Sequence, residues 1–549
     1  MLLLNRYRTP GVYFERLDAD LRIIQPLRTD IAGFVGLAER GPLDRPRRLS
    51  SWNQFRFQFG RAVAWSCLGE AVKGFFQNGG TTCWVVRAGN KNGNSQAQTR
   101  LYDAAGGEAL LLRAKGPGAW GNQISVYVSG QGLSRYTLNI LYPGGDTEVW
   151  ADLSMKADDP RFVTAVLNHP ETGSNLVEAA VLPAASPDRV PISDVLNVFP
   201  IFLDGGEDHP EQVTPEDLLG TESPSHDPRG LACLAGIDEI SIVCMPDLVC
   251  SPAETPQAKP PRPRCFLPYP EPPVRPDVFP AAPEPPRFSR DQVFAMQAAL
   301  VAHCETLADR VAILDPPDAL MDPGQMLVWR ELFSSSYAAL YYPWLLIAGP
   351  EGGRELTRAM PASGHLAGLF ARGDLALGVH KPPANQPLLG VLDLTRALDD
   401  EEHGVLNERG INAIRAFPGR GIRPVGARTL SRDTHYRFLN VRRLTLMIRE
   451  AIEEGSQWTV FEPNNPELWL TIDRVVRFFL DGLWERGMLD GDTAEEAYSV
   501  ACDETTNPPQ ETEVGRVICL VGIRPPWPAE FVIIRLAVSR DGVALVEGG

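Results

Sequence analysis

One short stretch of the sequence has the spacing of a motif that binds dinucleotides. Residues 116–121 read G-P-G-A-W-G, which matches the G-x-G-x-x-G of NAD- and FAD-binding turns. Such a turn binds a pyrophosphate when a strand precedes it and a helix follows it, because the helix N-terminus faces the phosphates. Residues 108–115 are typical of a strand, but every second residue from Ile124 to Val128 is apolar, which is the period of another strand. We therefore predict a connection between two strands, with no bound cofactor and with Trp120 as a packing residue.

Motifs of other enzyme classes are absent from the sequence. It contains no Walker A sequence, no H-E-x-x-H zinc motif and no G-x-S-x-G nucleophile turn. His365 and His380 have no cysteine or carboxylate at ligand spacing, and the nine cysteines form no C-x-x-C pair. The tripeptide R-G-D at 372–374 we interpret as chance. We predict no catalytic, cofactor-binding or metal-binding residue, and we expect the cysteines to be buried and reduced.

Composition argues against two kinds of partner. The 69 acidic and 52 basic residues give a formal net charge of −17, and a diffuse acidic surface repels the phosphates of nucleic acids. No apolar run approaches the roughly 18–20 residues that span a bilayer, and the first residues lack the apolar segment of a signal peptide. We expect assembly in the cytoplasm, without nucleic acid and without direct membrane insertion.

The middle of the chain alternates strands with helices, which predicts an α/β layer sheet. The expected strands of this sheet lie at 81–88, 237–247, 311–317 and 337–348. Helical patterns lie at 288–310, where Ser289 is a typical N-cap, and at 363–372. Between 103 and 199, short alternating runs separated by Gly, Asn and Asp turns predict a small β-rich module inserted into the sheet.

The rest of the chain contains a proline-rich segment and a compact C-terminal part. Residues 252–286 hold 14 of the 49 prolines, so they predict a surface loop that is either a tolerated excursion or a docking segment. Two amphipathic helices are expected at 440–455 and 466–487, and two strands at 516–523 and 529–539. The last strand is long and apolar on both faces, and it lies at the end of the chain.

Three blocks between residues 410 and 470 carry a resemblance to a known family. They are GINAIRAFPGRGIRPVGARTLS (410–431), YRFLNVRRL (436–444) and QWTVFEPNNPELW (457–469). In this order they resemble the C-terminal half of the contractile tail sheath family, which includes phage tail sheaths, contractile bacteriocins and extracellular contractile injection systems. TPGVYFE (9–15) is similar to the N-terminal arm of that family, and PAEFVII (528–534) to its C-terminal arm.

The resemblance implies a fold class and a division into domains. It implies an α/β core, subtilisin-like but non-catalytic, with an inserted β-rich outer domain, a C-terminal α+β domain and extended terminal arms. The expected boundaries are 1–28 for the N-terminal linking arm, 29–102 and 200–420 for the core, 103–199 for the outer domain, 421–528 for the C-terminal domain facing the inner tube, and 529–549 for the C-terminal arm. The proline-rich segment 252–286 departs from the family pattern.

The resemblance also implies a structural function rather than an enzymatic one. Subunits of this family assemble as stacked hexameric rings around an inner tube and contract to drive the tube through a target membrane. The implied partners are further copies of the chain, the tube protein, baseplate and terminator proteins, and an assembly or recycling ATPase. The particle would be a phage tail or an injection particle, released or membrane-anchored. A hydrolase or a nucleotide-linked enzyme on the same α/β core is the alternative, although no subtilisin-type G-T-S-M-A or H-G-T segment is present.

Two sets of residues are candidates for contacts between subunits. The resemblance implies that the arms add strands to sheets of neighbouring subunits, a form of binding in which main-chain hydrogen bonds supply affinity and alternate side chains supply specificity. The expected arm contacts are Val12, Tyr13, Phe14, Phe531, Val532, Ile533, Ile534 and Leu536. The candidate tube-facing or interface charges are Arg442, Arg443, Glu467, Asp473, Arg474, Arg477 and Asp481. Arg442 and Arg443 could instead pair with acidic groups inside the fold.

Overall fold

The structure, a computed structural model, describes residues 23–546 apart from several gaps. The gaps are 91–92, 104, 131–134, 144–145, 170–171, 184, 188, 190, 193–199, 221–226, 250–283, 320, 350–356, 531–534 and 540–541. The predicted arm contacts Val12, Tyr13, Phe14 and Phe531–Ile534, and most of the proline-rich segment, therefore lie outside the described residues. The chain divides into two compact units, one from Arg28 to Leu446 together with the chain from Trp527, the other from Met447 to Pro526 together with the chain before Arg28.

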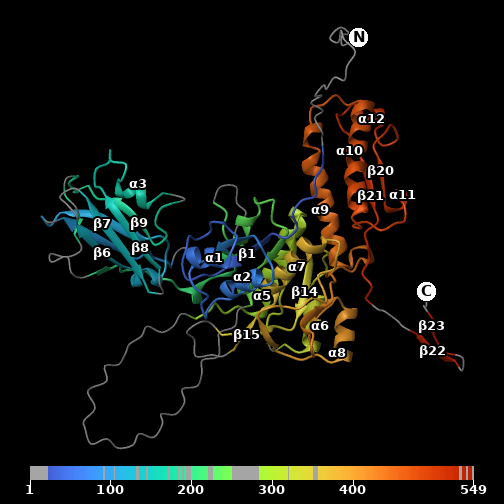
Figure 1. Cartoon of the computed structure of the whole chain (residues 1–549), viewed down its shortest axis with the longest axis horizontal. Helices are drawn as coiled ribbons and strands as arrows, with labels where there is room; N and C mark the ends of the chain where they lie inside the picture. The colour runs from blue at the N-terminus through green and yellow to red at the C-terminus, as the bar shows by residue number, and fades with distance from the viewer. Residues whose placement is uncertain are drawn as a thin grey trace, which may run out of the picture. The chain divides into compact units, whose positions relative to one another are not determined.

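An eight-stranded sheet forms the centre of the larger unit (Figure 1). Its strands, in spatial order, are β19 (Gly421–Val425), β18 (Ile411–Phe417), β14 (Ala338–Tyr342), β13 (Val311–Leu314), β12 (Ile242–Cys244), β1 (Ala32–Gly36), β3 (Cys83–Arg87) and β2 (Arg47–Leu49). The strands from β18 to β3 run parallel, and β19 and β2 close the two edges antiparallel. The predicted α/β layer sheet is therefore present. Residue 421, the predicted start of the C-terminal domain, is the first residue of β19, which is an edge strand of this sheet.

Helices cover both faces of the central sheet, which explains why its strands are apolar runs rather than alternating ones. One face packs against α1 (Trp52–Phe59), α2 (Leu68–Gln77) and α7 (Ser363–Leu377). The other packs against α4 (Pro215–Leu219), α5 (Arg290–Leu307), α6 (Pro323–Glu331) and α8 (Asp400–Glu408). Helix α5 begins at the predicted N-cap, where Ser289 and Gln292 form a capping box.

The segment 337–348 forms two strands rather than the single strand that the sequence predicts. Strand β14 ends before Pro343, which has no N–H to donate to a ladder. The chain then starts β15 (Leu345–Ala348) in a separate sheet, between β16 (Thr357–Met360) and β17 (Val391–Leu394). The proline therefore moves the second half of an apolar run into another sheet.

A buried carboxylate lies where β13 meets the start of α7, and it gives the fold a pH dependence. Asp315 accepts a hydrogen bond from Ser363 N at 3.0 Å, and burial raises the pKa of Asp315 to about 6. Because this pKa lies above that of an unfolded aspartate, the folded state loses stability as pH rises from about 4 to about 6, by about 3 kcal/mol in all. We expect the free energy of unfolding of Asp315→Asn, measured with urea at several pH values, to fall less between about pH 4 and pH 6 than that of the unaltered chain. If the free energy of unfolding changed with pH equally in both proteins, Asp315 would not be the source of the pH dependence.

The β-rich region consists of two antiparallel sheets that share one hydrophobic cluster, from Ala97 to Leu203. The first sheet contains, in spatial order, β10 (Pro191–Ile192), β4 (Gln98–Asp103), β5 (Glu108–Ala114) and β9 (Val177–Val181). The second contains β11 (Ile201–Phe202), β6 (Ser125–Gly130), β7 (Tyr136–Tyr142) and β8 (Asp146–Leu153), and α3 (Val163–Leu167) follows β8. The chain enters and leaves this region side by side, since Ser95 pairs with Glu207 and Gln98 with Asp204.

The G-x-G-x-x-G segment connects two strands, as the sequence predicts. It runs from the end of β5 through a 3-10 turn (Ala119–Gln123) to β6, and no α-helix follows it. A Cβ at Gly116 would lie 2.5 Å from Gly41 O, so this glycine permits a close approach of two backbones. Trp120 is buried and packs edge-on against Tyr142, with ring centroids 5.8 Å apart. The predicted packing role of Trp120 is confirmed.

An arginine beside the central sheet packs against these two rings. The Arg40 guanidinium lies 5.8 Å from the Trp120 ring centroid and 5.1 Å from that of Tyr142, and it donates to Arg56 O at 3.1 Å. The Tyr142 hydroxyl donates to Glu39 at 3.2 Å. Cation–π contacts and the hydrogen bond therefore hold the β-rich region against the turn that follows β1.

Truncation of Trp120 should loosen this contact. For Trp120→Ala we expect the free energy of unfolding to fall by about 3–5 kcal/mol, because a large buried ring leaves a cavity. Val149→Ala, at an exposed position of the same region, should change it by less than about 0.5 kcal/mol. Urea unfolding followed by circular dichroism measures both. Equal effects in the two variants would mean that Trp120 does not support the contact.

The smaller unit contains helices and one two-stranded sheet. Helix α9 (Leu439–Gly455) enters it, and α10 (Pro466–Glu485), α11 (Ala494–Ala497) and α12 (Pro509–Thr512) follow. The N-cap Asn465 and Pro466 at the first position start α10. The two predicted long helices are confirmed. Strands β20 (Tyr498–Ala501) and β21 (Leu520–Ile523) pair antiparallel, so the predicted strand at 516–523 starts only at Leu520.

The chain after residue 534 forms a hairpin, which the sequence analysis missed. The predicted strand at 529–539 is described only as β22 (Arg535–Ser539), and it pairs antiparallel with β23 (Gly542–Val546). The pairing runs from Arg535 with Val546 to Ser539 with Gly542.

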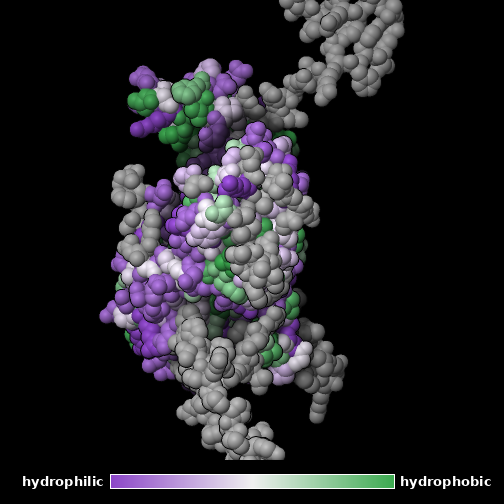
Figure 2. All heavy atoms as spheres, turned by 90° about the vertical axis from the view of Figure 1, so that its left-hand side faces the viewer, coloured by the Kyte–Doolittle hydropathy of each residue, from purple (hydrophilic) through white to green (hydrophobic). Residues whose placement is uncertain are grey.

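One side of the molecule has a largely polar surface. The side of the molecule in Figure 2 carries mostly hydrophilic residues, with apolar ones in scattered groups, as a chain of net charge −17 leads one to expect. Among the helices that the structure describes, none has the length and apolar character needed to cross a membrane. No three His, Cys, Asp or Glu side chains of the described part lie together as a metal site would require.

Candidate anchoring sites of the two terminal segments

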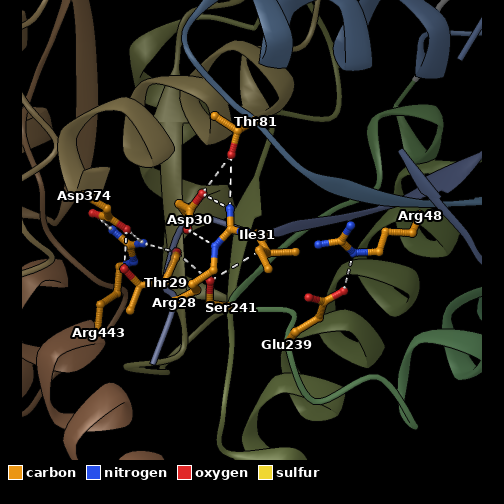
Figure 3. A network of polar contacts seen from close by, with 10 residues as sticks. All are labelled: Arg28, Thr29, Asp30, Ile31, Arg48, Thr81, Glu239, Ser241, Asp374 and Arg443. Carbon is orange, nitrogen blue, oxygen red and sulfur yellow. Dashed lines mark hydrogen bonds and ion pairs between the residues drawn. The ribbon is translucent and has the colours of Figure 1, made fainter. Parts of the chain in front are cut away.

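The N-terminal segment joins the central sheet at residues 28–31, and buried polar contacts hold it there (Figure 3). Thr29 O, just before β1, accepts from Ser241 Oγ at 2.5 Å and from the Arg443 guanidinium at 2.8 Å. Its side chain donates to Asp374 Oδ2 at 2.7 Å. One residue of the segment therefore makes contacts to α7, to α9 and to the residue before β12.

The centre of this network is a buried ion pair. Arg443 on α9 contacts Asp374 on α7 through both nitrogens of its fork, at 2.5 and 3.1 Å, and the side chains are 2% and 6% exposed. The guanidinium also lies over the Phe370 ring, 5.1 Å from its centroid. Burial raises the pKa of Asp374, and the charge of Arg443 acts in the opposite direction. A bidentate pair of this kind fixes the geometry, and removal of one partner leaves a buried charge uncompensated.

A second pair orders the backbone immediately before β1. Arg28 binds Asp30 through two hydrogen bonds of 2.9 and 2.7 Å, and Thr81 bonds to both residues at 3.1 and 3.2 Å. Asp30 is buried, whereas Arg28 is half exposed, and hydrogen bonding to Asp30 raises the pKa of Arg28. This pair lies beside the Thr29 network in Figure 3, so residues 28–30 are fixed on both sides.

The C-terminal segment has an anchor of the same chemical type. Arg428, after β19, binds the Glu530 carboxylate through Nε at 2.8 Å and through a second nitrogen, and it also donates to Asn407 O at 2.7 Å. The backbone of Arg428 is fixed by the buried Asn412 side chain, which accepts from its N–H at 2.7 Å and donates to its carbonyl at 2.8 Å. The segment that starts at Trp527 is therefore tied to the central sheet by a partly buried arginine–carboxylate pair.

The predicted charges Arg442 and Arg443 both have partners within the larger unit. The Arg442 guanidinium lies 3.6 Å from the ring centroid of Tyr436 and 4.5 Å from that of Tyr337, and it donates to Ser336 Oγ at 2.5 Å. Arg443 pairs with Asp374, as described above. The sequence leaves open whether these arginines contact the tube or another subunit, or groups inside the fold. The structure shows contacts inside the fold for both.

The predicted charges on α10 form local pairs or lie at the surface. Arg477 binds Asp473 one turn before it at 2.7 Å and also donates to Val500 O. Asp481 accepts from the Tyr498 hydroxyl. Two further predicted charges, Glu467 and Arg474, are exposed, as are the apolar side chains Leu470 and Phe478 of the same helix. The arm contact Leu536 lies in β22, where only the backbone is described.

Sequence reasoning missed the carboxylates of both anchors. Asp374 belongs to the R-G-D tripeptide at 372–374, and it is buried against Arg443 rather than displayed. Glu530 lies in the segment PAEFVII (528–534), and Arg428 in the block 410–431, so both were within motifs that the sequence analysis noted. Spacing along the chain gave no signal that would join these residues, because each pair spans a long sequence separation.

Comparison with family models gives two matches in the second half of the chain. Residues 288–430 match the model of the phage tail sheath protein central domain, and residues 431–539 that of the phage tail sheath C-terminal domain. The Arg428 and Arg443 anchors therefore lie in the matched part of the chain.

Curated relatives carry the same description. A tail sheath protein of Burkholderia phage BcepMu is 32% identical over 225 residues, 39% of this chain and 46% of the relative. A putative prophage major tail sheath protein of Pseudomonas aeruginosa is 25% identical over 252 residues, 44% of this chain and 62% of the relative. The chain thus spans about half the length of the curated relatives that it matches.

Solved structures match nearly the whole chain in fold. The sheath of the anti-feeding prophage in its contracted state has a TM-score of 0.55 at 20% identity, covering 97% of this chain and 100% of the other. The contracted sheath complex of PVC, an extracellular contractile injection system, has a TM-score of 0.54 at 18% identity, covering 97% and 99%. A sheath tail protein of Desulfitobacterium hafniense has a TM-score of 0.54 at 11% identity, covering 90% and 93%.

Proposed function

Because the chain belongs to the contractile tail sheath family, we propose that it is the structural subunit of a contractile sheath. The subunits would assemble as stacked hexameric rings around an inner tube and contract to drive the tube through a target membrane. The observation that carries this proposal is the match of the fold to contracted sheaths over 97% of the chain. The relatives are named as tail sheath proteins, so the proposed role is structural and involves no catalysis.

The fold supports different roles for the different domains of the subunit. The eight-stranded sheet with its two helical layers would be the subtilisin-like core, which moves as a rigid body. The β-rich region has its own hydrophobic cluster and is entered and left at adjacent positions, as an inserted outer domain would be. Its cluster spans residues 97–203, close to the expected boundaries 103–199. The contact of Arg40 with Trp120 and Tyr142 would hold this domain during contraction.

The terminal segments would link neighbouring subunits by strand addition. The acceptor that fits best is the sheet β20–β21, because two strands alone are marginal in water and neither edge meets a third strand among the described residues. Leu520 on β21 is 60% exposed, so an apolar side chain is already available there. The predicted arm residues Val12 and Phe14 alternate with Tyr13 and Glu15, and the segment 531–534 is apolar at every position, so each offers apolar side chains to such a pairing.

The two anchors would bear the mechanical force that passes between subunits during contraction. Each arm would be anchored in its own subunit and would pair as a strand with a neighbouring subunit. When the rigid cores move apart, the arm would therefore pull on its anchor. The Arg443–Asp374–Thr29 network and the Arg428–Glu530 pair are these anchors, and both lie within the larger unit. Buried bidentate pairs suit the position because they fix direction as well as distance.

Further partners follow from the proposed assembly. The exposed face of α10, with Glu467, Arg474, Leu470 and Phe478, is the surface that we propose for the tube protein or a neighbouring subunit. One similar structure is a baseplate of the anti-feeding prophage, which supports baseplate proteins as partners. Terminator proteins, a recycling or assembly ATPase, and assembly in the cytoplasm into a phage tail or an injection particle complete the proposal.

Electron microscopy of the purified full-length chain tests the proposed function. We expect the chain to form striated tubes or hollow contracted cylinders, alone or after coproduction with a tube protein. Sedimentation should show material far larger than a subunit. A chain that remains a stable monomer under all these conditions would contradict the proposal.

A further inference from the structure

Two cysteines of the smaller unit face each other across the sheet β20–β21. The ladder pairs Tyr498 with Ile523 and Ala501 with Leu520, and the next pair in the same register is Cys502 with Cys519. Directly opposite residues on antiparallel strands have their Cβ atoms about 4.5–5.5 Å apart. The two thiols are close enough to share a hydrogen bond. Both are reduced in the structure.

Backbone contacts show which kind of cross-strand pair this is. Arg524 N donates to Ala497 O at 2.8 Å, so these two residues form a hydrogen-bonded pair. Three positions on, Val500 O accepts from a side chain of α10 and therefore points away from β21. Because the two kinds of pair alternate, Cys502 and Cys519 form a pair without mutual backbone hydrogen bonds. The Cα atoms of such pairs are about 4.5 Å apart, within the range of about 4.4–6.8 Å that a disulfide spans.

The surrounding loop holds the two cysteines in this position. The buried Asn507 side chain accepts from Ile518 N at 2.6 Å and donates to Ile518 O at 3.0 Å and to Asp503 O at 3.1 Å. These contacts fix the residue after Cys502 and the residue before Cys519. Formation of a bond between the two sulfurs would therefore need little movement of the backbone.

The two sulfurs differ in exposure and in acidity, as an attacking and a resolving thiol do. Cys519 is partly exposed, whereas Cys502 is buried. A hydrogen bond from Cys502 lowers the pKa of Cys519, and the same interaction raises the pKa of Cys502. The thiolate is the nucleophile in thiol–disulfide exchange, so Cys519 is the thiol that reacts first with a reagent in solution.

We propose that Cys502 and Cys519 are a redox modification site that forms a cross-strand disulfide by exchange with a low-molecular-weight disulfide. The Cys519 thiolate attacks the reagent, forms a mixed disulfide and releases one small thiol. The Cys502 thiol loses its proton and attacks the Cys519 sulfur, which releases the second small thiol. The reagent is reduced by two electrons and the two cysteines are oxidised. The bond ties β20 to β21 across the 503–518 loop.

Other cysteines of the described residues are not suited to this reaction. Cys67, Cys83, Cys244 and Cys304 lie inside the two hydrophobic layers of the central sheet. Burial raises the pKa of Cys83 and of Cys244, so neither offers an accessible thiolate. Cys233, also buried, donates to Pro228 O and Asp44 O. The site is independent of the sheath function, because it rests on the geometry of one sheet alone.

The test uses the full-length folded chain and oxidised glutathione as the reagent. Cys250 and Cys265, which lie outside the described residues, are replaced by serine in every variant to remove their background. After quenching by alkylation, intact mass and peptide mapping report which cysteines have reacted. The background variant should lose two thiols, keep no glutathione and yield a peptide that links Cys502 to Cys519. Dithiothreitol should restore both thiols.

Single substitutions separate the two proposed roles. With Cys502→Ser we expect one glutathione to remain on Cys519, and with Cys519→Ser no reaction at Cys502 in the folded chain. Circular dichroism and a thermal melt before oxidation show that each variant is folded. The proposal is overturned if the background variant keeps glutathione on Cys519 without an internal bond, if another pair of cysteines is linked, or if Cys519 stays unreactive until the chain is unfolded.

Discussion

Deletion of residues 1–24 should yield a folded subunit that no longer forms a sheath. The deletion removes most of the predicted arm 1–28, including Val12 and Phe14, but leaves the residues 28–31 that anchor β1 through Thr29 and Arg443. The central sheet therefore keeps its contacts, while the link to a neighbouring subunit is lost. Circular dichroism should show an unchanged fold, and negative-stain electron microscopy should show the loss of tubes.

A matched control removes the same length of chain elsewhere. Deletion of residues 256–279 takes 24 residues from the proline-rich segment, which the family pattern does not require. We expect this variant to assemble like the unaltered chain. If the chain without residues 1–24 still formed a sheath of normal length and stability, the arm would not be the link between subunits.

The second large effect is expected at the anchor of the N-terminal segment. Asp374→Ala leaves the Arg443 guanidinium buried and unpaired, and removal of one partner of a buried pair costs about 3–5 kcal/mol. Asp374→Ala combined with Arg443→Met removes both charges and should recover most of this loss. Urea unfolding followed by tryptophan fluorescence gives the free energies of unfolding of the unaltered chain, of Asp374→Ala, of Arg443→Met and of the double variant, which together form a double-mutant cycle.

An exposed ion pair is the control for this cycle. Glu331 binds Arg409 and Arg432 at 3.4 and 3.3 Å at the surface, so Glu331→Ala should cost less than about 1 kcal/mol. If Asp374→Ala cost no more than Glu331→Ala, the buried network would not hold the segment. A double variant as unstable as Asp374→Ala alone would show that packing, and not charge, explains the effect.

Much of the fold could be predicted because local signals and tertiary packing agree. Helix α5 begins after the N-cap Ser289, whose capping box satisfies its first N–H groups, and α10 begins after the N-cap Asn465, whose side chain accepts from Leu468 N. The strands β12 and β13 are apolar runs because helices cover both faces of their sheet. Each of these features depends on residues close together in the sequence.

The errors arose where one residue or a distant pairing decides the outcome. Pro343 splits the apolar run 337–348 between two sheets, and its effect on the ladder outweighs the continuous hydrophobicity around it. The strand after residue 534 pairs with β23, which the dipeptide Asp541-Gly542 could have indicated, since Asp-Gly is typical of hairpin turns.

The candidate site was predictable only in part. The adjacent arginines 442 and 443 stand out in a block that resembles the family, but their partners lie far away in the sequence. Asp374 is 69 residues from Arg443, and Glu530 is 102 residues from Arg428. No periodicity connects such positions, because only the folded sheet brings them together. The cysteine pair escaped notice for the same reason, since its spacing matches no motif until β20 and β21 are paired.

The segment G-P-G-A-W-G shows how context changes the meaning of a motif. Its glycines permit a close approach to Gly41 rather than to a pyrophosphate, and Trp120 packs with Arg40 and Tyr142. The motif therefore lies at the joint between the central sheet and the β-rich region. The stability of that joint, and not the binding of a cofactor, is the property to measure there.

A cryo-electron microscopy map of the assembled particle tests the central claim most directly. We predict continuous density from the anchored residues 28–31 of one subunit to an added strand on the sheet β20–β21 of a neighbour, with the C-terminal segment beyond Glu530 reaching a neighbouring subunit as well. A map in which both terminal segments fold back onto their own subunit, with rings held together by other surfaces, would contradict the account.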